Sequence, residues 1–270
     1  MPSQHLPGHL VLTGASSGLG QALALHYAAP GRLLSLSGRD GARLAGVADA
    51  CRALGARVEA AQVDVTDAGA MADWLLAQDS LAPVDLLIAN AGLGGAAALA
   101  PRGGEDGVQA RALLAVNTLG LVNTVTPLLP RMRARRQGQL ALVGSIQGDL
   151  GLPQSPVYSA SKAAVRIYAD GLRRLLRADG IGVTTVLPGF IDTPMSQSLQ
   201  MARPFLWPAD KAARRIARDI ARGARYSIFP LPLRLAIGLG RALPSALTDF
   251  VLAQSLRHHR WPGPPPEGEA

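Results

Sequence analysis

The sequence predicts an α/β fold in which a doubly wound parallel sheet carries helices on both faces. Three observations predict it. Six short apolar runs alternate with segments of helical periodicity, as in repeated strand–helix–strand units. A glycine-rich turn directly follows the first run. The length of 270 residues suits one large α/β domain and is too short for two such domains.

Each element can be placed along the chain by its pattern. The apolar runs are short and rich in Leu and Val, as expected of strands buried on both faces of a sheet. The expected strands span residues 9–13, 32–37, 57–64, 84–90, 139–145 and 182–188. The intervening segments have apolar residues at helical spacing. The expected helices span about residues 18–29, 40–54, 67–78, 105–136 and 156–179.

The composition indicates a globular chain with dispersed basic residues. Hydrophobic residues make up 48%, charged residues 17% and aromatic residues 4%. The net charge of +8 would suit nucleic acid, a membrane surface or an anionic ligand, but the basic residues are spread from Arg32 to Arg260. The densest group, at residues 131–136, precedes a glycine at an expected helix end, where cations are favourable. We therefore expect no nucleic-acid partner.

Cysteine and histidine usage argues against a disulfide or a metal centre. Cys51 is the only cysteine, and the five histidines show no recurring ligand spacing with a carboxylate. The N-terminus has no charged segment followed by an apolar stretch, and no uninterrupted apolar run reaches about 18 residues. We therefore expect no metal and a cytoplasmic location.

The turn after the first expected strand reads TGASSGLG, residues 13–20. Its glycines, Gly14, Gly18 and Gly20, lie where the strand must turn into a helix. Glycine lets the backbone approach a phosphate closely, and the N-terminus of the next helix supplies free N–H groups and the positive end of its dipole. The turn therefore predicts a nucleotide phosphate site.

A tyrosine and a lysine lie four residues apart in YSASK, residues 158–162. Lys162 and Lys211 are the only lysines among 27 lysines and arginines. On a helix this spacing places Tyr158 and Lys162 on one face, where an ammonium would stabilise a phenolate and lower the tyrosine pKa toward neutrality. An isolated pair of this kind is usually ordinary packing and solvation, so the surrounding motifs must decide its role.

Seven motifs in order resemble those of the short-chain dehydrogenase/reductase family, with good coverage from about residue 8 to 195. The resemblance implies a single Rossmann-type domain over residues 1–261, with about seven strands and a helical C-terminal extension. The Pro- and Gly-rich composition of the chain's last residues separately predicts a disordered tail at 262–270. The motifs are TGASSGLG at 13–20, DV at 64–65, NAG at 90–92, Asn117, Ser145, YSASK at 158–162 and PGFIDTPM at 188–195.

The resemblance also implies four catalytic residues. Tyr158 would be the general acid in carbonyl reduction, or the base in alcohol oxidation. Lys162 would lower the tyrosine pKa and bind the hydroxyls of the nicotinamide ribose. Ser145 would donate a hydrogen bond to the substrate oxygen. Asn117 would hold a water molecule that links Lys162 to solvent.

The end of the second expected strand indicates the cofactor. Family members that use NAD place an acid there for the adenosine ribose, whereas this chain has Gly38 followed by Arg39. We therefore expect NADP(H), with Arg39 on the 2′-phosphate and NAD(H) as the alternative. The other cofactor-binding residues implied by the resemblance are Gly14, Ser16, Ser17, Gly18, Leu19, Gly20, Asp64, Val65, Asn90, Ala91, Gly92, Tyr158, Lys162, Pro188, Gly189, Ile191 and Thr193.

Together these features predict an NADP(H)-dependent oxidoreductase that interconverts a carbonyl and a secondary alcohol on a small apolar molecule. The alternative is a non-catalytic NADP(H)-sensing protein on the same fold, although the four retained catalytic residues favour an enzyme. The resemblance further implies a homodimer or homotetramer.

The segment after the last motif is where the substrate site is expected. A lid at about residues 194–208 would line an apolar pocket through Met195, Leu199, Met201, Phe205, Leu206 and Trp207. The apolar extension at about 225–261 has three candidate roles: a wall of the substrate pocket, a peripheral membrane contact or a subunit contact.

Overall fold

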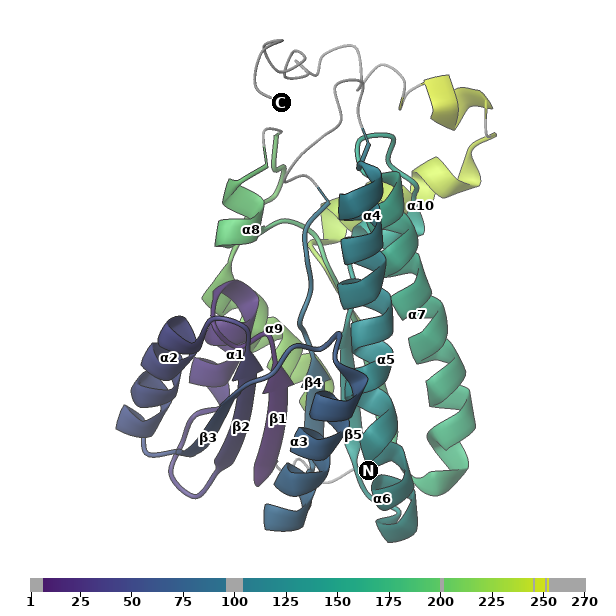
Figure 1. The fold of residues 1–270 in the computed structure, drawn as a ribbon. Helices are drawn as coiled ribbons and strands as arrows, with labels where there is room; N and C mark the ends of the chain where they lie inside the picture. The colour runs from purple at the N-terminus through teal and green to yellow at the C-terminus, as the bar shows by residue number, and fades with distance from the viewer. Residues whose placement is uncertain (1–6, 96–103, 200–201, 245, 251, 253–270) are drawn as a thin grey trace.

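A seven-stranded parallel sheet lies between two layers of helices in the computed structural model, which describes residues 7–95, 104–199, 202–244, 246–250 and 252 (Figure 1). The strand order is β3-β2-β1-β4-β5-β6-β9, with every pair parallel. This confirms the predicted fold class. The strands are β1 (His9–Thr13), β2 (Leu33–Gly38), β3 (Arg57–Gln62), β4 (Leu86–Ala89), β5 (Gln139–Val143), β6 (Gly182–Pro188) and β9 (Tyr226–Phe229).

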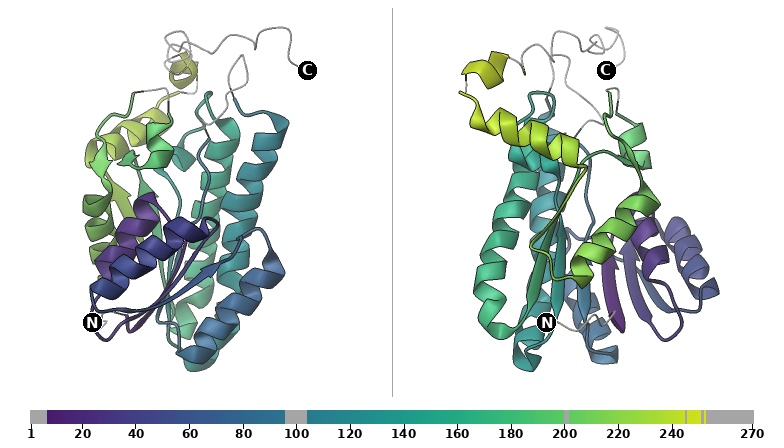
Figure 2. Two further views of the ribbon diagram at one scale, coloured as in Figure 1. Left: turned by 60° about the vertical axis from the view of Figure 1, so that its left-hand side comes forward. Right: turned by 180° about the vertical axis from the view of Figure 1, so that it is seen from behind.

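Helices cover both faces of the sheet because the central strands are apolar on both sides. In β1, Leu10 and Leu12 pack into one core cluster while Val11 packs into the other. The first cluster is closed by α1 (Gly18–Tyr27), α2 (Gly41–Ala53) and α9 (Ala209–Ala221). The second is closed by α3 (Ala68–Leu81), α5 (Gly120–Val125), α6 (Leu129–Arg135) and α7 (Pro156–Leu176) (Figure 2).

The expected helix at 105–136 is interrupted in the structure. It comprises α4 (Gly107–Leu114), a π-helical turn (Ala115–Leu119), α5, a 3₁₀ turn (Thr126–Leu128) and α6. By length and composition alone this assembly could cross a membrane. In the fold its inward side chains, including Leu121 and Met132, pack in the core against the sheet, so it serves as a core helix.

The segment expected to be a helical extension begins with a strand instead. Residues Tyr226–Phe229 form β9, the seventh strand, which pairs with β6. The helix α9 before it was also not among those expected. A four-residue strand followed at once by an apolar helix forms one continuous apolar run, which periodicity cannot divide. The expected tail at 262–270 lies outside the described residues.

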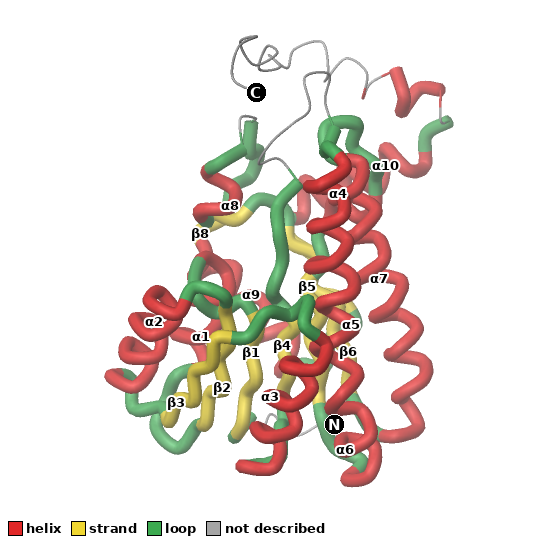
Figure 3. Tube along the Cα trace, in the orientation of Figure 1, coloured by secondary structure: helices red, strands yellow, loops and turns green. Residues whose placement is uncertain are grey.

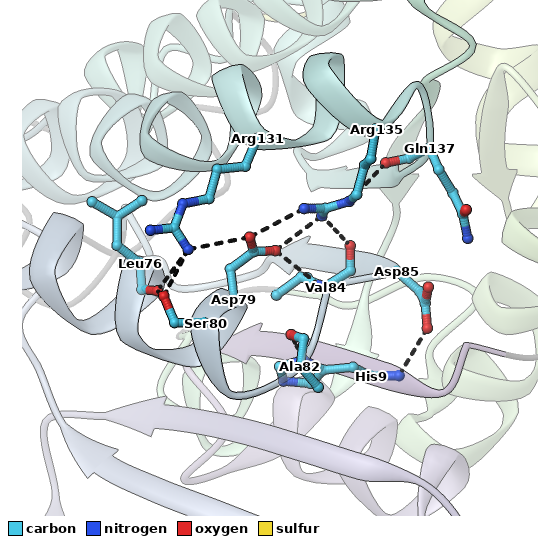
Figure 4. Close-up of polar contacts among 10 residues, drawn as sticks. All are labelled: His9, Leu76, Asp79, Ser80, Ala82, Val84, Asp85, Arg131, Arg135 and Gln137. Carbon is cyan, nitrogen blue, oxygen red and sulfur yellow. Dashed lines mark hydrogen bonds and ion pairs between the residues drawn. The ribbon is translucent and has the colours of Figure 1, made fainter.

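The densest arginine group has specific partners that the expectation of helix-terminal cations did not include. Asp79, near the end of α3, has a side chain only 5% exposed. Its carboxylate lies 2.9 Å from Arg135 Nη2 and 3.4 Å from Arg131 Nη1, and accepts a 2.9 Å hydrogen bond from the Val84 N–H (Figure 4). This carboxylate therefore connects α3 to α6, which pack on the same face of the sheet.

The same contacts set the ionisation of Asp79. Burial alone would raise its pKa, but the hydrogen bond from Val84 and the charges of Arg135 and Arg131 outweigh burial and lower the pKa. The carboxylate therefore stays ionised at neutral pH, where it is paired.

Replacing this carboxylate should destabilise the fold. We expect Asp79→Ala to lower the free energy of unfolding by about 1–3 kcal/mol at pH 7, because two partly exposed guanidinium groups and the Val84 N–H lose their shared acceptor. Denaturant unfolding would measure this, with Asp73→Ala on the exposed face of α3 as a control that changes stability by no more than about 0.5 kcal/mol.

The effect of Asp79→Ala should also depend on pH. A carboxyl group with a lowered folded pKa stabilises the protein above its unfolded pKa and loses that contribution as pH falls through the folded value. The difference between wild type and variant should therefore shrink below about pH 4. A difference that stays constant from pH 7 to pH 3 would contradict the assigned ion pairs.

Candidate active site

The carboxyl ends of the central strands open into one cavity of about 1080 Å³. It lies where the strand order reverses, because β1 pairs with both β2 and β4, and such a switch point is the usual ligand site of an open α/β sheet. Helices α8 (Pro194–Gln197) and α10 (Leu231–Ala242) lie at this end of the molecule (Figure 3). Every catalytic or cofactor-binding residue expected from the sequence lines the cavity except Asn117.

The glycine-rich turn forms a cradle that side chains would fill. Gly14 and Gly18 have φ values of +67° and +55°, a region that favours glycine. A Cβ on Gly14 would lie 2.8 Å from the Cα of Ala91. Ser17 caps α1 without a side-chain hydrogen bond, which leaves the N–H groups of the first turn to a ligand. This geometry fits the phosphates of a dinucleotide.

Asn90 holds the glycine-rich turn from the neighbouring strand. Its Nδ2 donates to the carbonyl oxygens of Thr13 and Gly14, both at 3.1 Å. The Thr13 hydroxyl in turn accepts from the N–H groups of Asn90 and Ala91, both at 3.2 Å. The side-chain amide of Asn90 thus fixes the ends of β1 and β4 relative to each other.

Ser145, Tyr158 and Lys162 meet on the opposite wall of the cavity. Ser145 follows β5, while Tyr158 and Lys162 lie one turn apart in α7. The Tyr158 phenol lies beside the Ser145 side chain, whose Oγ accepts from the Gln147 N–H at 3.1 Å. Lys162 Nζ lies 5.8 Å from the centre of the Tyr158 ring and donates to the Val143 carbonyl at 3.3 Å. The structure therefore brings together two hydroxyls and an ammonium.

Burial dominates the ionisation of this group. It lowers the pKa of Lys162 to about 8. Burial also raises the pKa of Tyr158, and the neighbouring Ser145 side chain opposes that rise only in part. The sequence predicted a lowered tyrosine pKa, but in the structure the direction is the reverse. Tyr158 is thus a neutral phenol at pH 7, which is the form that can give up a proton.

Asn117 lies behind the cavity wall, in the π-helical turn between α4 and α5. Its Oδ1 accepts from the Leu93 N–H at 2.8 Å, and its Nδ2 donates to the Leu93 carbonyl and the Ser161 hydroxyl, both at 3.1 Å. A Cβ on Gly92 would lie 3.1 Å from Asn117 Oδ1 and 3.4 Å from Lys162 Nζ. Asn117 therefore links the chain after β4 to the helix that carries Lys162.

The far end of the cavity is lined by two arginines and two carboxylates, Arg39, Arg43, Asp40 and Asp64. Arg39 lines it and is exposed. Asp40 does not compete for this space, because it caps α2 by accepting from the Arg43 N–H at 3.0 Å and pairs with Arg43 Nε at 2.6 Å. A hydrogen bond from the Thr66 N–H and the charge of Arg39 lower the pKa of Asp64. Arg43, which no sequence motif predicted, also lines the cavity.

The expected lid contributes fewer residues than predicted. Met195 and Leu199 line the cavity, and Met201 lies outside the described residues. Phe205 is exposed and does not line the cavity, nor does Leu206. Trp207 stacks on Phe229 with ring centres 4.9 Å apart. It lies in β8 (Trp207–Pro208), which pairs with β7 (Ile191–Asp192), so the segment between them is anchored at both ends.

The C-terminal extension forms part of the cavity wall. In α10, Leu233 and Ile237 line the cavity, whereas Leu231, Leu235 and Leu239 are 60%, 63% and 63% exposed. The i, i+4 spacing of the two lining residues is the signal that would have found them in the sequence. Of the three roles considered for the extension, the structure places this helix as a wall.

The buried ammonium of Lys162 should cost stability. A folded pKa near 8 lies below that of an unfolded lysine, so the unfolded state binds more protons between about pH 8 and 10.5 and stability rises with pH there. We expect Lys162→Met to melt a few degrees higher than wild type at pH 7, with a gap that narrows toward pH 10. Lys211→Met, at the exposed lysine over the Trp207 ring, is the control. A variant that melts lower at pH 7 would contradict this account.

Comparison with known proteins agrees with this geometry. The family model for short chain dehydrogenases matches residues 8–204. An uncharacterized oxidoreductase from Myxococcus xanthus is 35% identical over 240 residues, which cover 88% of this chain and 94% of that protein. The ketoacyl reductase HetN from Nostoc sp. is 30% identical over 199 residues, which cover 73% and 68%. The solved structure of a short-chain dehydrogenase from Sphingobium yanoikuyae in complex with NADPH has a TM-score of 0.76 and 26% identity, with coverage of 97% and 98%. The chain therefore belongs to the short-chain dehydrogenase family of oxidoreductases, which act on small molecules with a nicotinamide dinucleotide.

Proposed function

We propose that this chain is an NADP(H)-dependent oxidoreductase that interconverts a carbonyl and a secondary alcohol. The observation that carries the proposal is the pair of hydroxyl side chains, Ser145 and Tyr158, on one wall of a cavity whose other wall is the glycine cradle. This arrangement leaves room for a dinucleotide and a small substrate in one cavity.

The chain's own residues account for the proton chemistry. The Ser145 hydroxyl donates a hydrogen bond to the substrate carbonyl oxygen, and the Tyr158 phenol gives its proton to the same oxygen. The Lys162 ammonium holds the nicotinamide ribose and stabilises the phenolate that remains. Asn117 fixes the π-helical turn near Lys162. Along this side of the site, solvent replaces the proton that Tyr158 has given up. When bound, the nicotinamide supplies the hydride that the carbonyl carbon receives.

The preference for NADP(H) rests on the end of β2. Gly38 stands where an acid would favour NAD, the Asp40 carboxylate is turned to the N-terminus of α2, and Arg39 is exposed beside the cavity. The Sphingobium relative was solved with NADPH, which supports the same choice. Because cells keep the NADP pool largely reduced, we propose carbonyl reduction as the working direction.

We propose an apolar carbonyl compound as the substrate. The cavity near Tyr158 is bounded by Leu150, Leu152, Leu233 and Ile237, which favour contact with hydrocarbon. The name of the relative HetN describes a ketoacyl reductase, and a keto group on an apolar chain fits this lining. The competing function is an NADP(H)-sensing protein without turnover, which the variants below would distinguish.

We further propose a cytoplasmic protein that assembles as a homodimer or homotetramer. Large apolar side chains are exposed on the π-helical turn before α5 and on α7, where Leu119 is 61% and Ile167 is 70% exposed, as on surfaces that pack against another subunit. The exposed leucines of α10 leave a subunit contact and a peripheral membrane contact as alternatives for that helix.

Removing the phenolic hydroxyl should abolish turnover. We expect Tyr158→Phe to lower kcat for carbonyl reduction by at least about 100-fold while NADPH binding stays nearly intact, because the cradle is unchanged. Tyr168→Phe, on the same helix and outside the cavity lining, is the matched control. Stopped-flow or steady-state oxidation of NADPH would measure kcat, and fluorescence titration would measure Kd. Full activity of Tyr158→Phe would refute the proposed mechanism.

Removing the guanidinium beside β2 should change cofactor choice. Arg39→Ala should raise the Kd for NADPH roughly ten- to a hundredfold, since a hydrogen bond to a charged group is lost, and should leave the Kd for NADH unchanged. Arg57→Ala, at the exposed opposite end of β3, controls for net charge. A wild-type protein that binds NADH more tightly than NADPH would show that Arg39 does not select the cofactor.

A further inference from the structure

The helix that carries Tyr158 and Lys162 is capped by a carboxylate from a distant part of the chain. Glu105, which precedes α4, accepts hydrogen bonds from the N–H groups of Val157 and Tyr158 at 3.1 and 2.8 Å. These are the second and third residues of α7, whose first residue is Pro156. One carboxylate therefore satisfies both free N–H groups at the start of this helix, where negative charge also favours the helix dipole.

The ordinary capping residue is engaged elsewhere. Ser155 precedes α7 but makes no side-chain hydrogen bond to it. Its hydroxyl instead accepts a 2.6 Å hydrogen bond from Gln147 Nε2, and both side chains belong to residues that line the cavity. A serine in this position usually caps its own helix. Here Glu105 performs that role, and Ser155 is free to form part of the cavity wall.

The segment around Glu105 joins two helices of the site. Asp106, the next residue, caps α4 by accepting from the Gln109 N–H at 2.7 Å. Gly104, the preceding residue, has a φ of +82°, and a Cβ there would lie 3.8 Å from Pro156 Cδ. Adjacent carboxylates thus cap α4, which leads into the turn holding Asn117, and α7, which carries Tyr158.

We propose that Glu105 is a positioning residue that fixes Tyr158 for proton transfer. The inference rests on the proposed function and adds a residue to it. Tyr158 is held through its own N–H by Glu105, and on its side chain by Gly95, where a Cβ would lie 2.5 Å from Tyr158 Cβ. With the backbone fixed, only two side-chain torsions separate it from the phenol that meets Ser145. Glu105 touches neither hydroxyl and acts through the helix start alone.

The test compares Glu105→Ala with Glu105→Gln, which keeps one carbonyl acceptor, and with Asp67→Ala. Asp67 is the N-cap residue of α3 and also caps its helix with a carboxylate, by accepting from the Ala70 N–H at 2.9 Å, but that helix carries no proposed catalytic residue. Amide hydrogen exchange of the peptide spanning 155–162 should be faster in Glu105→Ala. The kcat for carbonyl reduction should fall about ten- to a hundredfold, with the KM for NADPH within about threefold of wild type.

Glu105→Gln should be intermediate in both measurements. The melting temperature of each variant is measured to establish that folded proteins are being compared. The inference is overturned if exchange at 155–162 is unchanged in Glu105→Ala, or if kcat falls no further than in Asp67→Ala. The exchange result decides this even for a wild-type protein that reduces no carbonyl. Absence of wild-type turnover would instead contradict the proposed function.

Discussion

The parallel pairing of all seven strands is the constraint on which the site depends. Because every strand runs in the same direction, all the carboxyl ends lie on the same side of the sheet. The residues that follow β1, β4, β5 and β6 therefore meet there, although they are far apart in the sequence. Reversal of the strand order beside β1 opens the crevice at that edge. The cavity is therefore a consequence of topology, and the side chains only define its chemistry.

Buried charges at the two ends of the strands differ in how they are compensated. At the amino ends, the Asp79 carboxylate is paired with two arginines and a backbone N–H, so its charge is compensated and joins helices α3 and α6. At the carboxyl ends, the Lys162 ammonium is buried and donates to the Val143 carbonyl, and burial lowers its pKa. The first arrangement stabilises the fold, whereas the second is destabilising, as is common for charged groups held at a functional site.

Sequence patterns predicted the parts of the molecule that depend on local order. Gly14 and Gly18 adopt the backbone angles that the glycine-rich turn required, and the six expected strands are present near their expected positions. The pattern did not separate β9 from α10, because a four-residue strand has too few residues to display a period of its own. The direction of the Tyr158 pKa was also mispredicted, since the i, i+4 spacing gives proximity to Lys162 but not the degree of burial.

Contacts between distant segments lie beyond such patterns for a physical reason. The Glu105 cap on α7 joins residues 53 apart in the chain, and Glu105 itself has no feature that marks it among surface acids. The sequence around α7 even suggests a different cap, because Ser155 stands where a capping serine is expected. In the structure, however, the Ser155 hydroxyl accepts a hydrogen bond from Gln147. A helix start that contributes its usual cap to a binding wall must obtain another acceptor. In this fold that acceptor is Glu105, just before α4, so hydrogen bonds connect the starts of the two helices that border the site.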